Sequence, residues 1–251
     1  VESLKLLGGL DEINKTSLES FLNGCIEDGG FLDSPFPWEP MYSTGKAILI
    51  INETGLWNIL NTTKSLEFIN HSMQIEGGFS SNPSDRIPKV ENTFFMVASL
   101  KVLGYVSKYA ERIKSYLDGC LRPEGGASES MYLGDLWHTT LSVMIMDKIG
   151  KIYDLNLTSL VDYINSCYIG SKPHFQIMRV LEKSIYPVPY EFKDLGLYNV
   201  INDYLSMKSL YLISKYHEVN LDLYNSQISL NLKDLQILDT GSKYYGTVSY
   251  T

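Results

Sequence analysis

The chain of 251 residues contains little cysteine and no long hydrophobic run, and each absence excludes a class of protein. Its three cysteines, Cys25, Cys120 and Cys167, are odd in number and widely spaced, so they do not indicate a disulfide-bonded scaffold. No apolar run reaches the roughly 18 residues that a membrane-spanning helix needs. Residues 1–20 lack the pattern of a secretory signal peptide, although the chain begins at Val1 without Met. We therefore expect a cytoplasmic location.

Positive charge is also scarce, because 21 Lys and Arg side chains stand against 29 Asp and Glu side chains, which gives a net charge of −8. This balance argues against a general binder of nucleic acid or of anionic membranes. Hydrophobic residues make up 44% of the chain and charged residues 20%, as in ordinary globular domains. The composition therefore predicts a folded chain that buries a sizeable core.

The sequence repeats itself with a period near 48 residues. Paired glycines that follow an acidic residue begin at Gly29, Gly77 and Gly125, and both steps are 48 residues long. A second marker is a Thr followed eleven residues later by a Gly. It occurs at Thr44 and Gly55, Thr93 and Gly104, and Thr139 and Gly150. Two independent markers with one period indicate a true internal repeat.

Each repeat predicts a hairpin of two helices. The first segment carries apolar residues at helical spacing on one face, and a Gly-Gly turn and a polar loop follow it. The second segment is apolar nearly all round and ends at a glycine suited to a helix C-cap. Because it is apolar on every side, the second helix should be the more deeply buried one. The first segments are residues 17–25, 65–73, 112–120 and 160–167, and the clearest second segments are 92–104 and 138–150.

The period is clear over residues 1–165 and degenerate over residues 166–251. Residues 173–184 and 204–218 still have a helical pattern. Stacking such hairpins in register gives an all-α repeat assembly, which we predict as a single domain over residues 1–251.

The cysteines follow the repeat. Cys25, Cys120 and Cys167 each lie four residues after an aromatic residue of the first helix, and the second repeat has Ser72 at that position. One repeat position on one helix face favours a packed small residue over a metal or redox role.

The hairpin with its Gly-Gly turn resembles the repeat of prenyltransferases and terpenoid cyclases. The stretch FINHSMQIEGGF, residues 68–79, is similar to that family's Phe/Tyr-x4–5-Gln-x2-Gly-Gly-Phe signature. The resemblance covers residues 1–150 well and the rest of the chain loosely. It implies an α/α toroid, also called a six-hairpin α/α barrel, with inner and outer helices around an apolar central cavity.

Within this family the chain resembles most the β subunits of protein prenyltransferases. Their zinc-site loop carries Arg-x-x-Lys, and the loop RIPK puts Arg86 and Lys89 at the pair that grips the isoprenoid diphosphate in the family. Their next repeat carries Asp-x-(Tyr/Phe)-His-Thr. Here DLWHTT puts His138 at the position of a zinc ligand, with Asp135 and Trp137 beside it. The resemblance also implies a helical-repeat α subunit as a partner.

The sequence departs from that family at the zinc site. The family's Asp-x-Cys becomes Glu91-Asn92-Thr93, with one residue missing before it, so no cysteine stands there. A catalytic zinc site needs roughly three protein ligands, and Glu91 with His138 supplies two. The family uses zinc to hold the acceptor's cysteine as a thiolate. The resemblance therefore implies zinc only in a degenerate site. One repeat earlier, EPMYST lacks the family's diphosphate-contacting His but keeps Tyr42.

Each of these residues also has a purely structural interpretation. Arg86 and Lys89 form either a diphosphate clamp or two solvated loop cations. His138 is either a helix-start residue with local hydrogen bonds or a metal ligand, diphosphate donor or general base. Asp135 and Glu91 suit the N-terminal ends of helices through the macrodipole as well as they suit a site. The aromatic residues at the inner-helix starts pack in a core or line a cavity for an isoprenoid.

Our hypothesis is an isoprenoid diphosphate-binding, prenyltransferase-like protein. A toroid kept only for binding or assembly is the main alternative. A terpene cyclase-like enzyme is a further alternative, although the Asp-x-Asp-Asp acid of the class II cyclases is missing, and no pair of opposed carboxylates identifies a glycosidase. The predicted catalytic residues are His138, Asp135 and Glu91, of which His138 and Glu91 are also the candidate metal ligands. The predicted substrate contacts are Arg86, Lys89, Thr93, Phe94, Trp137 and Tyr42.

Overall fold

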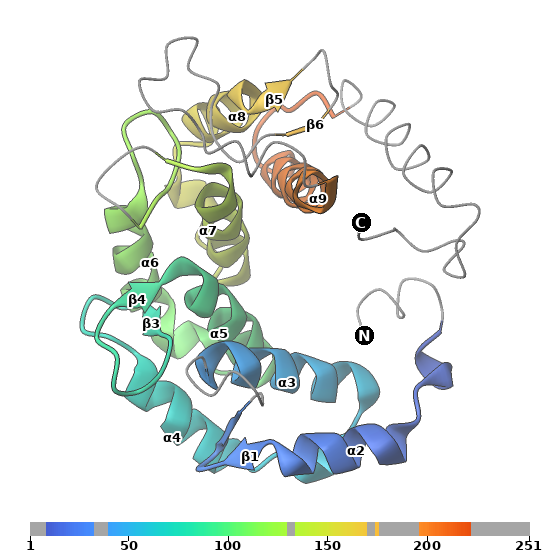
Figure 1. Ribbon diagram of the computed structural model, residues 1–251. Helices are drawn as coiled ribbons and strands as arrows, with labels where there is room; N and C mark the ends of the chain where they lie inside the picture. Colours follow the sequence, from blue (N-terminus) through green and yellow to red (C-terminus); the bar gives the residue numbers. More distant parts are fainter. Residues whose placement is uncertain (1–8, 33–39, 130–133, 170–173, 176–195, 222–251) are drawn as a thin grey trace. The chain divides into compact units, whose positions relative to one another are not determined.

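The computed structural model describes residues 9–32, 40–129, 134–169, 174–175 and 196–221. The chain divides into two compact units. The helices and strands of both units can be followed along the chain in Figure 1. The first unit is Val1–Gly119 with Lys148–Lys151, and the second is Cys120–Asp147 with Ile152–Thr251. The single domain over residues 1–251 stays a prediction. No helix in the described ranges is long and apolar enough to cross a membrane.

The first unit is built of helical hairpins whose two helices are joined through short antiparallel strand pairs. In the first pair Ile26 lies opposite Phe31, and in the second Phe79 lies opposite Lys89. The elements are η1 (Leu10–Glu12), α2 (Lys15–Gly24), β1 (Ile26–Glu27), β2 (Gly30–Phe31), α3 (Pro40–Thr54), η2 (Trp57–Ile59), α4 (Thr62–Ser72), β3 (Phe79–Ser80), β4 (Pro88–Lys89), α5 (Val90–Val102) and α6 (Val106–Cys120).

The second unit continues the same pattern. Its elements are α7 (Leu136–Lys148), η3 (Ile152–Asp154), α8 (Leu157–Ser166), β5 (Tyr168–Ile169), β6 (His174–Phe175) and α9 (Gly196–Ile213). Each of the six predicted helical segments of the clear repeats is confirmed, and α9 confirms the helical prediction for 204–218 as far as Ile213. For 173–184 only His174 and Phe175 are described. They pair with β5 as a strand, so the predicted helix is wrong there.

Three outer helices begin with the same cap. The side-chain oxygens of Asn14, Asn61 and Asn156 accept hydrogen bonds from backbone N–H groups three residues later, over 3.0, 3.1 and 3.2 Å. An Asn at this position satisfies one of the N–H groups that a helix start leaves unpaired. These caps therefore fix where α2, α4 and α8 start.

The inner helices are the more deeply buried ones, as their composition predicts. Helix α7 buries nine of its 13 residues, whereas the outer helix α4 buries three of its 11. Small hydroxyl residues let inner helices approach closely. Ser99 of α5 donates to the carbonyl of Gly45 in α3 over 3.1 Å, and Ser209 of α9 donates to the carbonyl of Thr140 in α7 over 3.3 Å.

The first glycine of each Gly-Gly turn lies against the next outer helix. Gly29, Gly77 and Gly125 have positive φ angles of 88°, 106° and 95°, which suit glycine. A Cβ atom at these positions would lie 2.5, 1.8 and 2.2 Å from backbone oxygens of the following outer helix, those of Lys64, Arg112 and Ser159. Glycine is therefore required both by the backbone conformation and by the lack of space.

The second glycine of each turn lies under an aromatic ring of that same outer helix. A Cβ atom at Gly30, Gly78 or Gly126 would come within 2.7 Å of Phe68, Tyr116 or Tyr163. These rings occupy one repeat position, so every described turn is covered by the hairpin that follows it.

The repeat threonines tie each turn to its own inner helix. The hydroxyl oxygens of Thr44, Thr93 and Thr139 accept from the backbone N–H that follows the second glycine, over 2.8, 3.0 and 2.8 Å. All three side chains are completely buried. The Thr of the repeat marker is thus an architectural residue.

The cysteine position is packed as predicted in three repeats. Cys120 and Cys167 are buried and Ser72 is completely buried, whereas Cys25 is half-buried. The role of a packed small residue is therefore confirmed for Cys120 and Cys167.

Gly77→Ala should lower the free energy of unfolding by about 3–5 kcal/mol, because it adds positive-φ strain and a backbone clash with α6. Gly104 is the matched control, since its φ is 81° but no described atom lies within 4 Å of the place that a Cβ would take. Gly104→Ala should cost only the strain, about 1–2 kcal/mol. Urea unfolding followed by circular dichroism measures both losses. Equal losses would contradict the close approach of the turn to α6.

Candidate functional site

The predicted cation Arg86 lies near the end of the loop between β3 and β4, and Lys89 is the last residue of β4. The Gln74 side-chain amide nitrogen donates to Ser80 Oγ and to the Asp85 carbonyl, over 3.0 Å in each case. This amide therefore holds the loop next to the Gly-Gly turn. Arg86 is exposed and Lys89 is half-buried.

Two hydroxyl groups fix the backbone at Lys89. Thr93 donates to the Lys89 carbonyl over 2.7 Å, and Tyr116 of the next outer helix donates to the Pro88 carbonyl over 3.2 Å. Lys89 is also the residue just before α5, where the positive end of the helix dipole favours an anion. The loop thus combines a fixed backbone with positive charge.

An aromatic cluster follows on the inner helices of the same unit. The ring of Phe95 lies 4.6 Å from that of Tyr42 and 5.3 Å from that of Phe94, in edge-to-face arrangements. Lys46 Nζ lies 3.9 Å from the centre of the Tyr42 ring, and Lys148 Nζ lies 5.8 Å from that of Phe94. The predicted contacts Tyr42 and Phe94 are therefore brought together.

Lys46 and Lys148 were not predicted from the sequence, and Phe95 was predicted only as one of the aromatic residues at the inner-helix starts. Helical spacing carries a signal for Lys46, which lies one turn after Tyr42. Phe95 adjoins a predicted residue, but the sequence does not show which of two neighbouring rings meets a ring on another helix. Nothing in the sequence places Lys148, at the far end of a later helix, beside Phe94.

Thr93 and Glu91 occupy different surroundings in the first turn of α5. Thr93 is completely buried and bonded to backbone on both sides, so it has no exposed surface for the predicted substrate contact. Glu91 is half-buried at the helix start, where an acidic side chain suits the macrodipole. Its catalytic and metal roles stay predictions.

In the second unit Asp135 uses both carboxylate oxygens on His138. Oδ1 accepts from the His138 backbone N–H over 2.9 Å, which caps the start of α7. Oδ2 lies 2.5 Å from the ring nitrogen Nδ1. A carboxylate on Nδ1 holds the imidazole in one orientation and makes Nε2 the outward nitrogen.

Glu129 approaches the other side of the same ring. Its Oε1 lies 3.6 Å from His138 Nε2, longer than a hydrogen bond. The sequence did not identify Glu129, because it sits in a loop whose course no periodicity predicts. His138 and Trp137 are half-buried, so the imidazole is reachable from solvent.

The backbone beside Asp135 is held as it is beside Lys89. Thr139 donates to the Asp135 carbonyl over 2.5 Å, and Tyr163 of α8 donates to the Gly134 carbonyl. Burial, and then the neighbouring Cys167 and Asp135, raise the pKa of Tyr163 well above its ordinary value. Its hydroxyl therefore stays protonated and remains a donor.

A zinc ion does not fit the donors that the structure places together. No group of three or more His, Cys, Asp or Glu side chains within the described ranges is arranged to hold a metal. The carboxylates of Asp135 and Glu129 lie at opposite ring nitrogens of His138, so they do not converge on one point. Glu91 and His138 belong to different units, and their pairing at a metal stays a prediction.

The comparisons with known proteins agree with the repeat. The family described as prenyltransferase alpha-alpha toroid domain matches residues 41–171. No curated protein matches the chain. Among solved structures, Candida albicans protein geranylgeranyltransferase-I complexed with GGPP is similar to the chain, with a TM-score of 0.67 and 21% identity. The match covers 91% of this chain and 71% of that one. The predicted all-α toroid fold is therefore confirmed.

Asp135→Asn should keep the helix cap and lose only the charge on the ring, whereas Asp135→Ala should lose both. We expect Asp135→Ala to lower the free energy of unfolding by about 1–2 kcal/mol and Asp135→Asn by less than about 0.5 kcal/mol. Asn156→Ala, which removes a cap without a histidine, is the control and should cost about 1 kcal/mol. Urea unfolding measures all three. An Asn variant as unstable as the Ala variant would show that the ring contact, not the cap, stabilises this end of α7.

Proposed function

Because the chain belongs to the prenyltransferase α/α toroid family, we propose that it binds an isoprenoid diphosphate and transfers the prenyl group to an acceptor. One observation supports this most: a cationic loop leads directly into a helix that carries an aromatic cluster. Lys89 and Phe94 are five residues apart, or about 7.5 Å along a helix axis. That separation suits an anionic head group joined to an apolar chain.

Arg86 and Lys89 would bind the diphosphate. A guanidinium offers a planar fork to phosphate oxygens, and an ammonium offers a compact charge. Both would neutralise the charge that builds on the diphosphate as its bond to the prenyl carbon breaks. Tyr42, Phe94 and Phe95 would contact the prenyl chain, whose apolar surface is well suited to rings.

His138 and Asp135 would activate the acceptor. With Asp135 at Nδ1, Nε2 of His138 takes the proton of an acceptor thiol or hydroxyl. The acceptor's sulfur or oxygen then forms a bond to the prenyl carbon, and the diphosphate leaves with the electron pair of the broken carbon–oxygen bond. Glu91 keeps its predicted catalytic role, and Trp137 keeps its predicted role as a substrate contact. This scheme does not depend on zinc.

A toroid that binds without catalysing is the second candidate. The observation that favours it is the lack of a convergent metal-binding group in the described ranges, since zinc activates the acceptor in the β subunits that the sequence resembles. Such a protein would still use the cationic loop and aromatic cluster. For both candidate functions we propose a helical-repeat partner subunit and a cytoplasmic location.

Calorimetric titration with farnesyl and geranylgeranyl diphosphate tests the binding site. Arg86→Ala/Lys89→Ala should weaken binding about 100-fold, because two charged contacts are lost. Lys101→Ala/Lys108→Ala removes two exposed lysines of α5 and α6 and should change binding less than about twofold. If wild-type protein fails to bind either diphosphate, the proposed function is wrong.

Metal analysis of the purified protein tests the zinc-independent scheme. We expect less than one equivalent of zinc and no change of diphosphate binding after chelation. Tight zinc at one equivalent, lost in His138→Ala but retained in Asn92→Ala, would instead support a zinc site that includes His138.

A further inference from the structure

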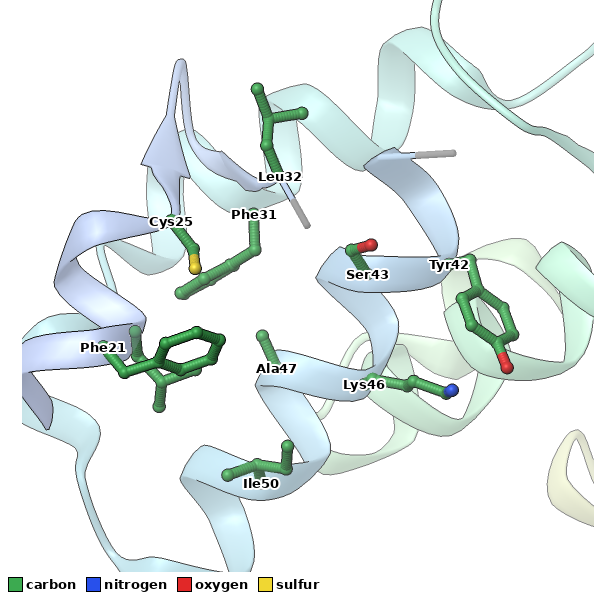
Figure 2. A pocket seen from close by; sticks show the side chains of 10 residues that line it. Phe21, Cys25, Phe31, Leu32, Tyr42, Ser43, Lys46, Ala47 and Ile50 are labelled. Atoms are coloured by element: carbon green, nitrogen blue, oxygen red, sulfur yellow. The ribbon is translucent and has the colours of Figure 1, made fainter. Parts of the chain in front are cut away.

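A pocket of about 150 Å³ opens in the first hairpin, between α2 and α3 (Figure 2). Figure 2 shows the side chains of Phe21, Cys25 and Phe31 gathered on one side, facing Ala47 and Ile50 of α3. All of the described lining comes from the first unit. Of the residues proposed above for the isoprenoid diphosphate, Tyr42 lines the pocket, whereas Arg86, Lys89, Phe94 and Phe95 do not.

One lysine is the only charged residue among the described residues that line the pocket. Lys46 leaves α3 at the pocket's edge, is exposed, and rests on Tyr42 with its Nζ 3.9 Å from the ring centre. Its contacts are with the rings of Tyr42 and Phe95, and no carboxylate in the described part of the chain pairs with it. Its flexible four-carbon stem allows the ammonium group to turn from the ring to an anion at the pocket.

This lysine distinguishes the first hairpin from the two that follow. The residue two positions after the repeat threonine is Lys46 in α3, Phe95 in α5 and Leu141 in α7. Phe95 and Leu141 are apolar, as expected for an inner helix that packs on its neighbours. Leu141 is buried and Phe95 contacts Tyr42. A charge at this position is therefore a specific feature of the pocket.

Phe21 also differs from its equivalents. Phe68, Tyr116 and Tyr163 each lie against the second glycine of a preceding turn. Phe21 is 63% exposed, and no glycine turn among the described residues lies on its ring. The pocket is thus accessible from its Phe21 side.

We propose that this pocket is a binding site for a small amphipathic anion. Its apolar body has about six carbon atoms, because an apolar cavity of about this volume holds a benzene-sized molecule. Its single carboxylate or phosphate group pairs with Lys46. Charge complementarity supports this occupant, since Lys46 supplies a positive charge at the edge of an otherwise uncharged lining among the described residues. The site shares Tyr42 with that proposed for the isoprenoid diphosphate.

The ligand's chain length should determine its affinity. Each methylene that enters the pocket strengthens binding about fourfold, so hexanoate should bind about 15-fold more tightly than butanoate. Octanoate should gain less than about fourfold over hexanoate, because its last carbons remain outside a filled pocket. Hexyl phosphate should bind at the same residues. Comparing its affinity with that of hexanoate shows whether the site prefers a phosphate or a carboxylate.

The test is a titration of the full chain with these ligands, followed by the methyl resonances of Ala47 and Ile50 in ¹³C NMR spectra. Lys46→Met should weaken hexanoate about tenfold and leave the neutral ligand hexanol within about twofold. Lys108→Met is the matched control, since Lys108 also lies over a tyrosine, 5.3 Å from the centre of the Tyr109 ring, but on α6. It should change neither affinity.

Three outcomes would overturn the proposal. Hexanoate that leaves the Ala47 and Ile50 resonances unmoved would mean that the pocket is closed, for instance by another part of the chain. Equal affinities of wild type and Lys46→Met for hexanoate would show that Lys46 does not contact the anion. Displacement of hexanoate by farnesyl diphosphate would make the pocket part of the isoprenoid site. Hexanoate binding with no isoprenoid binding would support this proposal while refuting the proposed function.

Discussion

The structure depends on a contact that only glycine can make. At Gly77 the turn backbone lies so close to α6 that a Cβ atom would stand 1.8 Å from the Arg112 carbonyl oxygen, and Gly29 and Gly125 repeat this contact with α4 and α8. Each hairpin is thereby positioned by the next one, because its turn rests on a helix from the following repeat. Stability in such an array comes from neighbouring pairs as well as from the hairpins themselves.

Equivalent hydrogen bonds hold the backbone at the two groups of candidate functional residues. Lys89 and Asp135 occupy one repeat position, four residues before the buried threonines Thr93 and Thr139, whose hydroxyls bind their carbonyls. A tyrosine of the following outer helix binds the carbonyl just before each of them. The architecture therefore supplies two equivalent, rigid places at the starts of inner helices. The sequence fills one with a cation and the other with a carboxylate that holds a histidine.

The sequence predicted the fold well because the fold is written in short-range patterns. The repeat period, the Gly-Gly turns and the C-cap glycines can each be recognised in the sequence, and each favours one backbone arrangement. The candidate residues were predicted in part. The Asp135–His138 contact spans a single helical turn, whereas Lys148 in the first unit and Glu129 in the second reach predicted residues through packing and loop paths that spacing does not encode. Thr93 shows the converse. A position in a family signature suggested a substrate contact, but its hydroxyl is used by the backbone.

The tyrosines have a consequence for how such a chain can change. Because Tyr116 binds the carbonyl before Lys89, and Tyr163 binds that before Asp135, each functional loop and its support are encoded in successive hairpins, 28 and 29 residues apart. Loss or exchange of a single hairpin would separate a loop from its support. A repeat that looks modular in the gene is therefore not an independent unit of function. Viable rearrangements would have to cut inside the hairpins, so that each turn travels with the outer helix that follows it.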